Sequence, residues 1–112
     1  MSIQSEKYDA AIALQQEGKV DDAIEQLKAL VEETPDYALA HSALSKFYSD
    51  LGQHAQAIEH GQKVCELEPE DGFGFTALST ICMKADDRTL AEEALAKARE
   101  AQIAAIRKQQ ED

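Results

Sequence analysis

The chain repeats itself at an interval of 34 residues. Three pairs of conformationally constrained or small residues share this offset: Pro35 and Pro69, Gly18 and Gly52, and Ala23 and Ala57. A period of this length is typical of proteins built from stacked helical hairpins, because one hairpin cannot bury its apolar face alone. Such a stack offers an extended groove to another protein rather than an enclosed pocket for chemistry.

The composition favours helices throughout. Of the 112 residues, 44% are hydrophobic, which is ordinary for a globular chain and argues against global disorder. Alanine, leucine, glutamate, glutamine and lysine are good helix formers and are abundant, and there are only two prolines. We therefore expect a single all-α domain over residues 1–112.

Alignment on the two prolines divides the chain into three units, at about residues 4–37, 38–71 and 72–105. In each unit a turn separates two helical patterns, and this turn holds Gly18, Gly52 and Asp86 in succession. Glycine suits a helix end because it enters the left-handed region without a Cβ clash, and aspartate does so less easily. The repeat is therefore expected to weaken in the third unit.

The third unit also lacks a closing proline. Its second helix is therefore expected to continue, from about Thr89 to about Gln110. An apolar stripe along this helix should cover the end of the stack; it consists of Leu90, Ala91, Ala94, Leu95, Ala98 and Ala101. Ile103 and Ile106 continue the apolar character beyond that stripe.

Small residues recur where the two helices of each unit should cross. They are Ala11 with Ala23, Ser45 with Ala57, and Ser79 with Ala91. Small side chains at a crossing allow the helix axes to approach closely. Gly61 lies within the second helix of the second unit and has no side chain, which predicts either a thin place in the packing or a close contact.

These residues resemble the tetratricopeptide repeat (TPR) family. The second unit matches through Leu44, Ser45, Tyr48, Gly52, Ala57, Val64 and Pro69. The first unit matches through Ala10, Ala11, Leu14, Gly18, Ala23, Leu27, Leu30 and Pro35, and the third through Phe75, Leu78, Ser79, Ala91, Leu95 and Ala98. The resemblance covers nearly the whole chain. It implies a right-handed α-solenoid of three hairpins, about six helices, with the extended C-terminal helix as a cap.

In TPR proteins the first helices of successive units line a concave surface that holds a partner peptide. The resemblance places ten candidate peptide-binding residues on that surface: Tyr8, Ile12, Leu39, Ser42, Lys46, Phe73, Thr76, Thr80, Met83 and Lys84. Ser5, Asp9, Gln16, Ser49 and Asp50 lie on the same predicted face. Aromatic and methionine side chains can anchor a partner, and Lys46 and Lys84 could hold a carboxylate. The alternative is that these are ordinary solvated helix residues.

One TPR subclass grips the C-terminal carboxylate of a chaperone with a set of lysines, asparagines and an arginine. The corresponding places here hold Tyr8, Ile12, Ala43, Phe73 and Ala77. That set is absent, so the resemblance does not extend to this subclass.

The net charge of −11 repels phosphate backbones and anionic lipid headgroups, so we expect neither nucleic acid nor a membrane as a partner. The first residues contain no apolar run and no positively charged lead-in, which favours a cytoplasmic protein.

No catalytic constellation is evident, so an enzyme is not expected. His41, His54 and His60 are not spaced as ligands on one helix, and we expect solvent-facing or partly packed imidazoles, with no metal and no other cofactor. Cys65 and Cys82 lie in apolar helical patterns and are expected to be small buried thiols. A redox pair that faces across a hairpin junction is the alternative.

The sequence therefore predicts a non-enzymatic interaction scaffold that binds a peptide segment of a partner protein in its concave groove. The alternative is a structural module that self-associates through the long C-terminal helix or through the groove.

Overall fold

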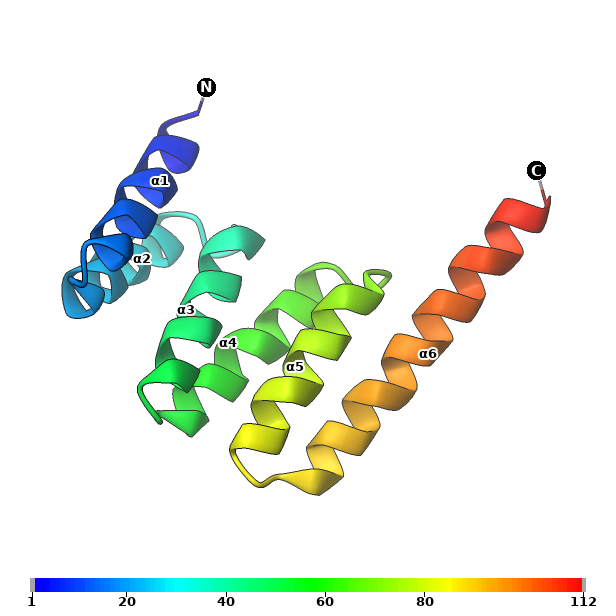
Figure 1. The fold of residues 1–112 in the computed structure, drawn as a ribbon. Helices are drawn as coiled ribbons and strands as arrows, with labels where there is room; N and C mark the ends of the chain where they lie inside the picture. Colours follow the sequence, from blue (N-terminus) through cyan, green and yellow to red (C-terminus); the bar gives the residue numbers. More distant parts are fainter. Residues whose placement is uncertain (1, 112) are drawn as a thin grey trace.

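The computed structural model describes residues 2–111, and these form six helices and no strand. The helices are α1 (Ile3–Gln16), α2 (Val20–Glu33), α3 (Ala38–Asp50), α4 (His54–Leu67), α5 (Gly72–Lys84) and α6 (Arg88–Glu111). They form three hairpins that lie side by side in chain order (Figure 1). The predicted all-α solenoid of helical hairpins is confirmed, and α6 is extended to 24 residues.

The three hairpins turn with the same backbone geometry. In each turn a backbone N–H, of Lys19, Gln53 or Asp87, donates to the carbonyl five residues earlier at 2.8 to 2.9 Å. The residue before each donor has a positive φ: 87° at Gly18, 77° at Gly52 and 60° at Asp86. Aspartate is one of the few residues with a side chain that enters this region readily. The third turn therefore keeps the geometry of the repeat although its residue differs.

The small residues predicted at the helix crossings are buried in all three hairpins. In the first hairpin, Ala11 and Ala23 are fully buried. In the second, the Ser45 hydroxyl donates to the carbonyl oxygen of Ala57 at 2.7 Å and so links α3 to α4. In the third, Ser79 instead donates to Thr76 of its own helix. Close helix crossing is therefore common to the three units, while the hydrogen bond between helices belongs to the second.

Gly61 makes a close contact between the second and third hairpins. A Cβ atom at this position would lie 3.0 Å from Leu78 Cδ1 and 3.1 Å from Ser45 Oγ. The equivalent residue of the first hairpin is Leu27, which is fully buried. The missing side chain thus makes room for Leu78, so a close contact, and not a thin place, accounts for Gly61.

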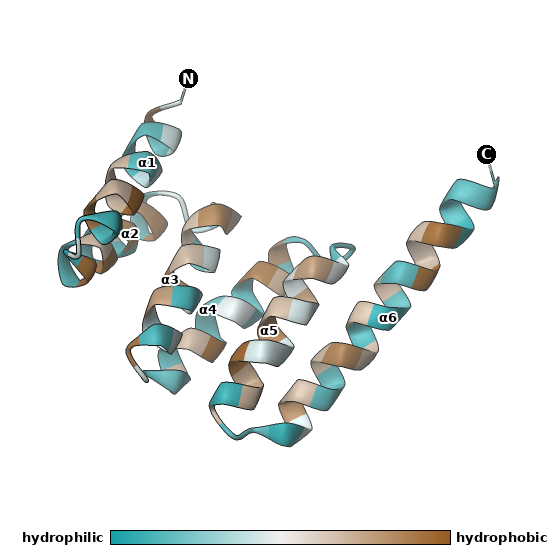
Figure 2. Cartoon of the chain, viewed as in Figure 1, coloured by the Kyte–Doolittle hydropathy of each residue, from teal (hydrophilic) through white to brown (hydrophobic). Residues whose placement is uncertain are grey.

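The apolar residues gather between the helices, and hydrophilic residues occupy much of the outer surface (Figure 2). On α6 the buried face consists of Ala91, Ala94 and Ala98. Leu95 is 37% exposed, so the prediction that it belongs to the covering stripe is wrong. Leu95 stands at the position of Gly61, the side that faces a following hairpin, and no described helix follows α6.

A histidine pair ties the second hairpin to the linker before it. His41 Nε2 lies 2.7 Å from the Pro35 carbonyl oxygen, and His41 Nδ1 lies 3.0 Å from His60 Nδ1. A carbonyl only accepts, so His41 Nε2 carries a proton and, in the neutral ring, His41 Nδ1 accepts from His60. Burial, and to a smaller extent the neighbouring His41, lower the pKa of His60 below its ordinary value of 6.5. The expectation of solvent-facing or partly packed imidazoles is wrong for His41, which is buried.

Replacing Gly61 with leucine, the residue of the first hairpin, is expected to lower the free energy of unfolding by about 1–3 kcal/mol through overpacking. Packing holds Leu78 in place, and a hydrogen bond holds Ser45, so neither can move aside freely. Chemical denaturation measures the change. Gln62→Leu, at the exposed neighbour, is the control and should stay within about 0.5 kcal/mol of the original protein. Equal stability of Gly61→Leu and the original protein would contradict the close contact.

Candidate functional site: a groove between α3 and α5

A groove lies between α3 and α5, the first helices of the second and third hairpins. It encloses a hollow of about 390 Å³. Its lining comes from three helices. The lining residues are Ser42, Ser45, Lys46, Ser49 and Asp50 of α3, Gly61 and Val64 of α4, and Gly74, Ala77, Leu78, Thr80, Ile81 and Lys84 of α5.

Helical spacing explains how this lining arises. Residues three, four or seven positions apart lie on one side of a helix, so Ser42, Ser45, Lys46 and Ser49 share a face of α3. Several lining residues are small, among them Ser45 and Ala77, and Gly61 and Gly74 have no side chain. The close packing of the second and third hairpins therefore leaves a space that a peptide backbone could enter.

Four of the ten predicted groove residues line this hollow: Ser42, Lys46, Thr80 and Lys84. Four others are exposed on α3 or α5 but do not line it: Leu39, Phe73, Thr76 and Met83. Tyr8 and Ile12 are partly buried on α1, where they pack against the hydrophobic cluster of the first two hairpins. The structure thus divides the predicted residues into three groups: those that line the hollow, an exposed margin (Leu39, Phe73, Thr76 and Met83), and Tyr8 and Ile12 on α1.

Several lining residues were not among the predicted site residues. Gly61 and Val64 enter the lining because α4 contributes to it, and Gly74 and Leu78 enter it from α5. The signal available in the sequence was the absence of a side chain at Gly61 and Gly74, which marks a close approach of backbones.

Ser49 supplies a polar atom that lacks a partner. Its Oγ is buried and makes no hydrogen bond to any described residue, although the residue lines the groove. Leaving a buried hydroxyl unsatisfied costs about 1–3 kcal/mol, so such groups are rare in native structures. The other atom of this kind, His54 Nδ1, does not belong to the groove lining. Ser49 is therefore a lining residue whose hydrogen-bonding capacity the described chain leaves unused.

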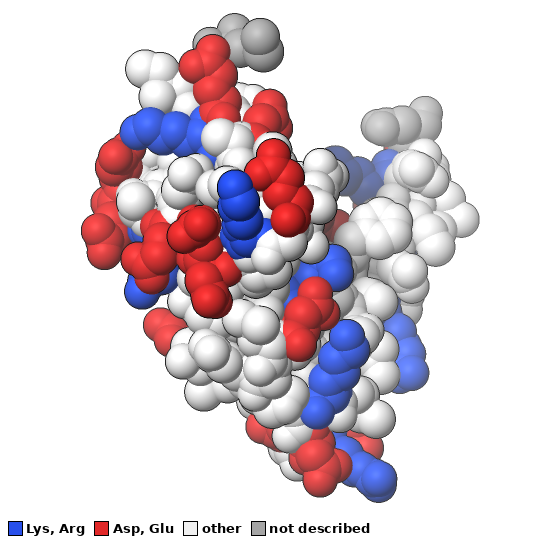
Figure 3. All heavy atoms as spheres, turned by 60° about the vertical axis from the view of Figure 1, so that its left-hand side comes forward, with Lys and Arg blue, Asp and Glu red and all other residues white. Residues whose placement is uncertain are grey.

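The groove carries two lysines in an acidic protein. Acidic side chains crowd over the first hairpin (Figure 3). In the groove, Lys46 Nζ lies 3.3 Å from the Asp50 carboxylate on an exposed surface. Among the described residues, no carboxylate lies within ion-pair distance of Lys84. The C-terminal ends of α3 and α5 therefore form a locally basic spot.

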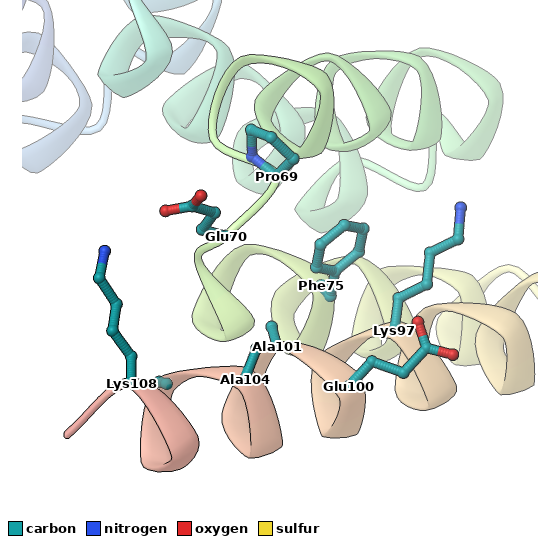
Figure 4. A pocket seen from close by; sticks show the side chains of 9 residues that line it. Pro69, Glu70, Phe75, Lys97, Glu100, Ala101, Ala104 and Lys108 are labelled. Atoms are coloured by element: carbon teal, nitrogen blue, oxygen red, sulfur yellow. The ribbon is translucent and has the colours of Figure 1, made fainter. Parts of the chain in front are cut away.

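A second hollow, of about 560 Å³, lies between the distal part of α6 and the linker that joins α4 to α5. Figure 4 shows Pro69, Glu70 and Phe75 on one side of it, facing the residues of α6. The α6 side consists of Lys97, Glu100, Ala101, Ala104, Ala105 and Lys108. Its two acidic and two basic side chains balance, and its lining includes neither Ser49 nor His54. We therefore take the smaller α3–α5 groove as the candidate site.

The thiols show no sign of activation. Cys65 and Cys82 are free and buried, as predicted, and burial raises the pKa of Cys65 to about 11 and also raises that of Cys82. A thiol that stays protonated near neutral pH is a poor nucleophile and a poor metal ligand. Within residues 2–111, no three His, Cys, Asp or Glu side chains are grouped to hold a metal ion. None of the helices in that range combines the length and apolar character of a membrane span.

A sequence model described as tetratricopeptide repeat matches residues 14–71, just over half of the chain. The chain belongs to the tetratricopeptide repeat family. This TPR chain is also similar to the Protein CTR9 homolog of Arabidopsis thaliana, with 28% identity over 69 residues. Those residues are 62% of this chain and 6% of that protein, so the chain corresponds to a small part of its relative.

Solved structures share the fold. MamA superposes with a TM-score of 0.83 at 21% identity, over 93% of this TPR chain and 61% of MamA. MamA from Desulfovibrio magneticus RS-1 gives 0.78 at 26% identity, over 88% and 55% of the two chains. The second TPR of Spaghetti (RPAP3), bound to the HSP90 peptide SRMEEVD, gives 0.76 at 15% identity, over 88% and 91%. This TPR chain thus spans a little over half of MamA.

Ser49→Ala is expected to raise the free energy of unfolding by up to about 1 kcal/mol, because it removes a buried hydroxyl that has no partner. Ser45→Ala is the matched control. It removes the hydrogen bond to Ala57 and should cost about 0.5–1.5 kcal/mol. Thermal or chemical denaturation distinguishes the two variants. If Ser49→Ala were as destabilising as Ser45→Ala, the Ser49 hydroxyl would have to be satisfied within the protein.

Proposed function

We propose that this TPR chain is a non-enzymatic protein–protein interaction module that binds a peptide segment of a partner in the α3–α5 groove. The buried, unpartnered hydroxyl of Ser49 is the observation that carries the proposal. A main-chain N–H or C=O of the bound segment would complete its hydrogen bonding. The small side chains around it admit a peptide backbone close to the helices. The peptide complex of the RPAP3 repeat supports the suitability of the fold for such binding.

In this proposal Ser42, Lys46, Thr80 and Lys84 contact the segment within the hollow. The exposed margin then extends the contact along the two helices, through Leu39, Phe73, Thr76 and Met83, and Tyr8 and Ile12 extend it onto α1. The net charge of −11 supports a protein partner over nucleic acid or an anionic membrane. Two free thiols support the cytoplasmic location that we infer.

A bulky residue in the groove should abolish peptide binding without unfolding the protein. Peptides are selected from a random display library on the original protein, and their affinities are measured for Ser42→Trp, at an exposed lining position. Loss of a central contact is expected to weaken binding by about tenfold or more. Gln56→Trp, exposed on α4 outside the groove, is the control and should bind normally. Selected peptides that bind both variants equally, or a selection that enriches none, would refute the groove proposal.

The second candidate function is self-association through α6. Three large apolar residues of this helix are exposed: Leu95 at 37%, Ile103 at 49% and Ile106 at 54%. Leu95 and Ile106 are 11 residues apart, about three turns, and so lie on one side of α6. In an antiparallel pair of α6 helices, Leu95 of each copy would meet Ile106 of the other, and two-fold symmetry would make this contact twice.

Under the second candidate, the original protein sediments as a dimer at high concentration and Ile106→Ser sediments as a monomer. Analytical ultracentrifugation over a concentration series measures this. Ala104→Ser, on the flank of α6 that faces the second hollow, serves as the control and should leave the dimer intact. A monomer at every concentration of the original protein would remove this candidate.

A further inference from the structure

We propose that the α3–α5 groove is polarised along its length. It selects segments that carry a bulky apolar side chain and a carboxylate, separated by about three to five residues of extended chain. This inference rests on the proposed peptide-binding function and names the kind of partner segment that the groove would accept.

The apolar end of the proposed contact is formed by Leu39 and Phe73, which belong to the exposed margin and do not line the hollow itself. These residues lie 34 positions apart and so occupy the same place in consecutive units, each in the first turn of its helix. Their exposed fractions are 55% and 86%, which are high for large apolar side chains. Leu39 precedes Ser42 and Lys46 at helical spacing, and Phe73 precedes Ala77 and Lys84 in the same way. Both apolar residues therefore continue the faces that line the hollow.

The opposite end is basic. Lys46 and Lys84 lie near the C-terminal ends of α3 and α5, and both line the hollow. Asp50 forms an exposed ion pair with Lys46. Such a pair is weak, so a carboxylate of the ligand can replace Asp50 as the partner of Lys46. Lys84 makes no ion pair with any described residue. A carboxylate on the ligand would therefore find one lysine free and a second that it can share.

The distances along α3 and α5 between the apolar residues and the lysines set the expected spacing in the peptide. Leu39 and Lys46 are seven residues apart, and Phe73 and Lys84 are eleven. At 1.5 Å per residue these intervals are about 10 and 16 Å. An extended peptide covers about 3.3 Å per residue, so three to five of its residues bridge the two ends.

This arrangement differs from the carboxylate grip of the chaperone-binding subclass. Ala43, Phe73 and Ala77 stand at three of the places that hold its polar residues. Here the cations lie instead toward the C-terminal ends of α3 and α5, and apolar residues occupy these three gripping positions.

The test compares selections from one random peptide library on the original protein, Lys84→Glu and Phe73→Ser. Peptides are scored only if Ser42→Trp abolishes their binding. The original protein should enrich an apolar residue and an Asp or Glu at the stated spacing, by about tenfold over the library. Lys84→Glu should lose the preference for acidic residues and keep the apolar one, whereas Phe73→Ser should do the reverse. Lys63→Glu, the same charge change on α4 outside the groove, should leave both preferences intact.

The possible outcomes separate this inference from the function on which it rests. Groove-dependent peptides without the two-part pattern, or with a pattern that Lys84→Glu does not alter, would overturn the inference and leave groove binding intact. A selection without any groove-dependent peptide would overturn both.

Discussion

The meeting of α3, α4 and α5 around Ser45 and Gly61 is the contact on which the rest of the structure depends. The Ser45 hydroxyl bonds to the Ala57 carbonyl at 2.7 Å, which holds α3 against α4. The same oxygen and the end of Leu78 occupy the space that a side chain at Gly61 would need. The small side chain of Ser45 and the absence of a side chain at Gly61 thus allow the second and third hairpins to pack closely. Because interiors are close-packed, such a junction cannot adjust gradually, and it sets where α5 lies relative to α3.

The position of α5 in turn creates the groove. Small residues are frequent in its lining, and one of them, Ser49, has a buried hydroxyl without a partner. An alanine there would be the better choice for stability alone. A residue that is suboptimal for folding and well placed for binding is the kind of compromise expected at a functional site.

The repeat itself was predictable from the sequence, because its cause is local. Glycine or aspartate with positive φ, proline after the second helix and small residues at crossings each act within one hairpin, so the period reveals them. The groove was less predictable because its lining combines three helices, and Val64 and Leu78 enter it only through tertiary packing. Leu95 matched the family pattern, yet it is exposed because no described helix covers it. His41 and His60 are 19 residues apart in the sequence and lie on different helices, so the 34-residue period gives no indication of their contact.

The pair of His41 and His60 also makes the stability of the second hairpin depend on pH. Because the pKa of His60 lies below 6.5 in the folded protein, the unfolded chain binds more protons as the pH falls through 6.5. The free energy of unfolding therefore decreases as the pH falls from 6.5 to the lowered pKa of His60. The carboxylate of Glu59 opposes this shift, but it is the smallest of the three influences on His60. Because His41 also binds the Pro35 carbonyl oxygen, the linker before the second hairpin is attached to a histidine pair whose contribution to stability depends on pH.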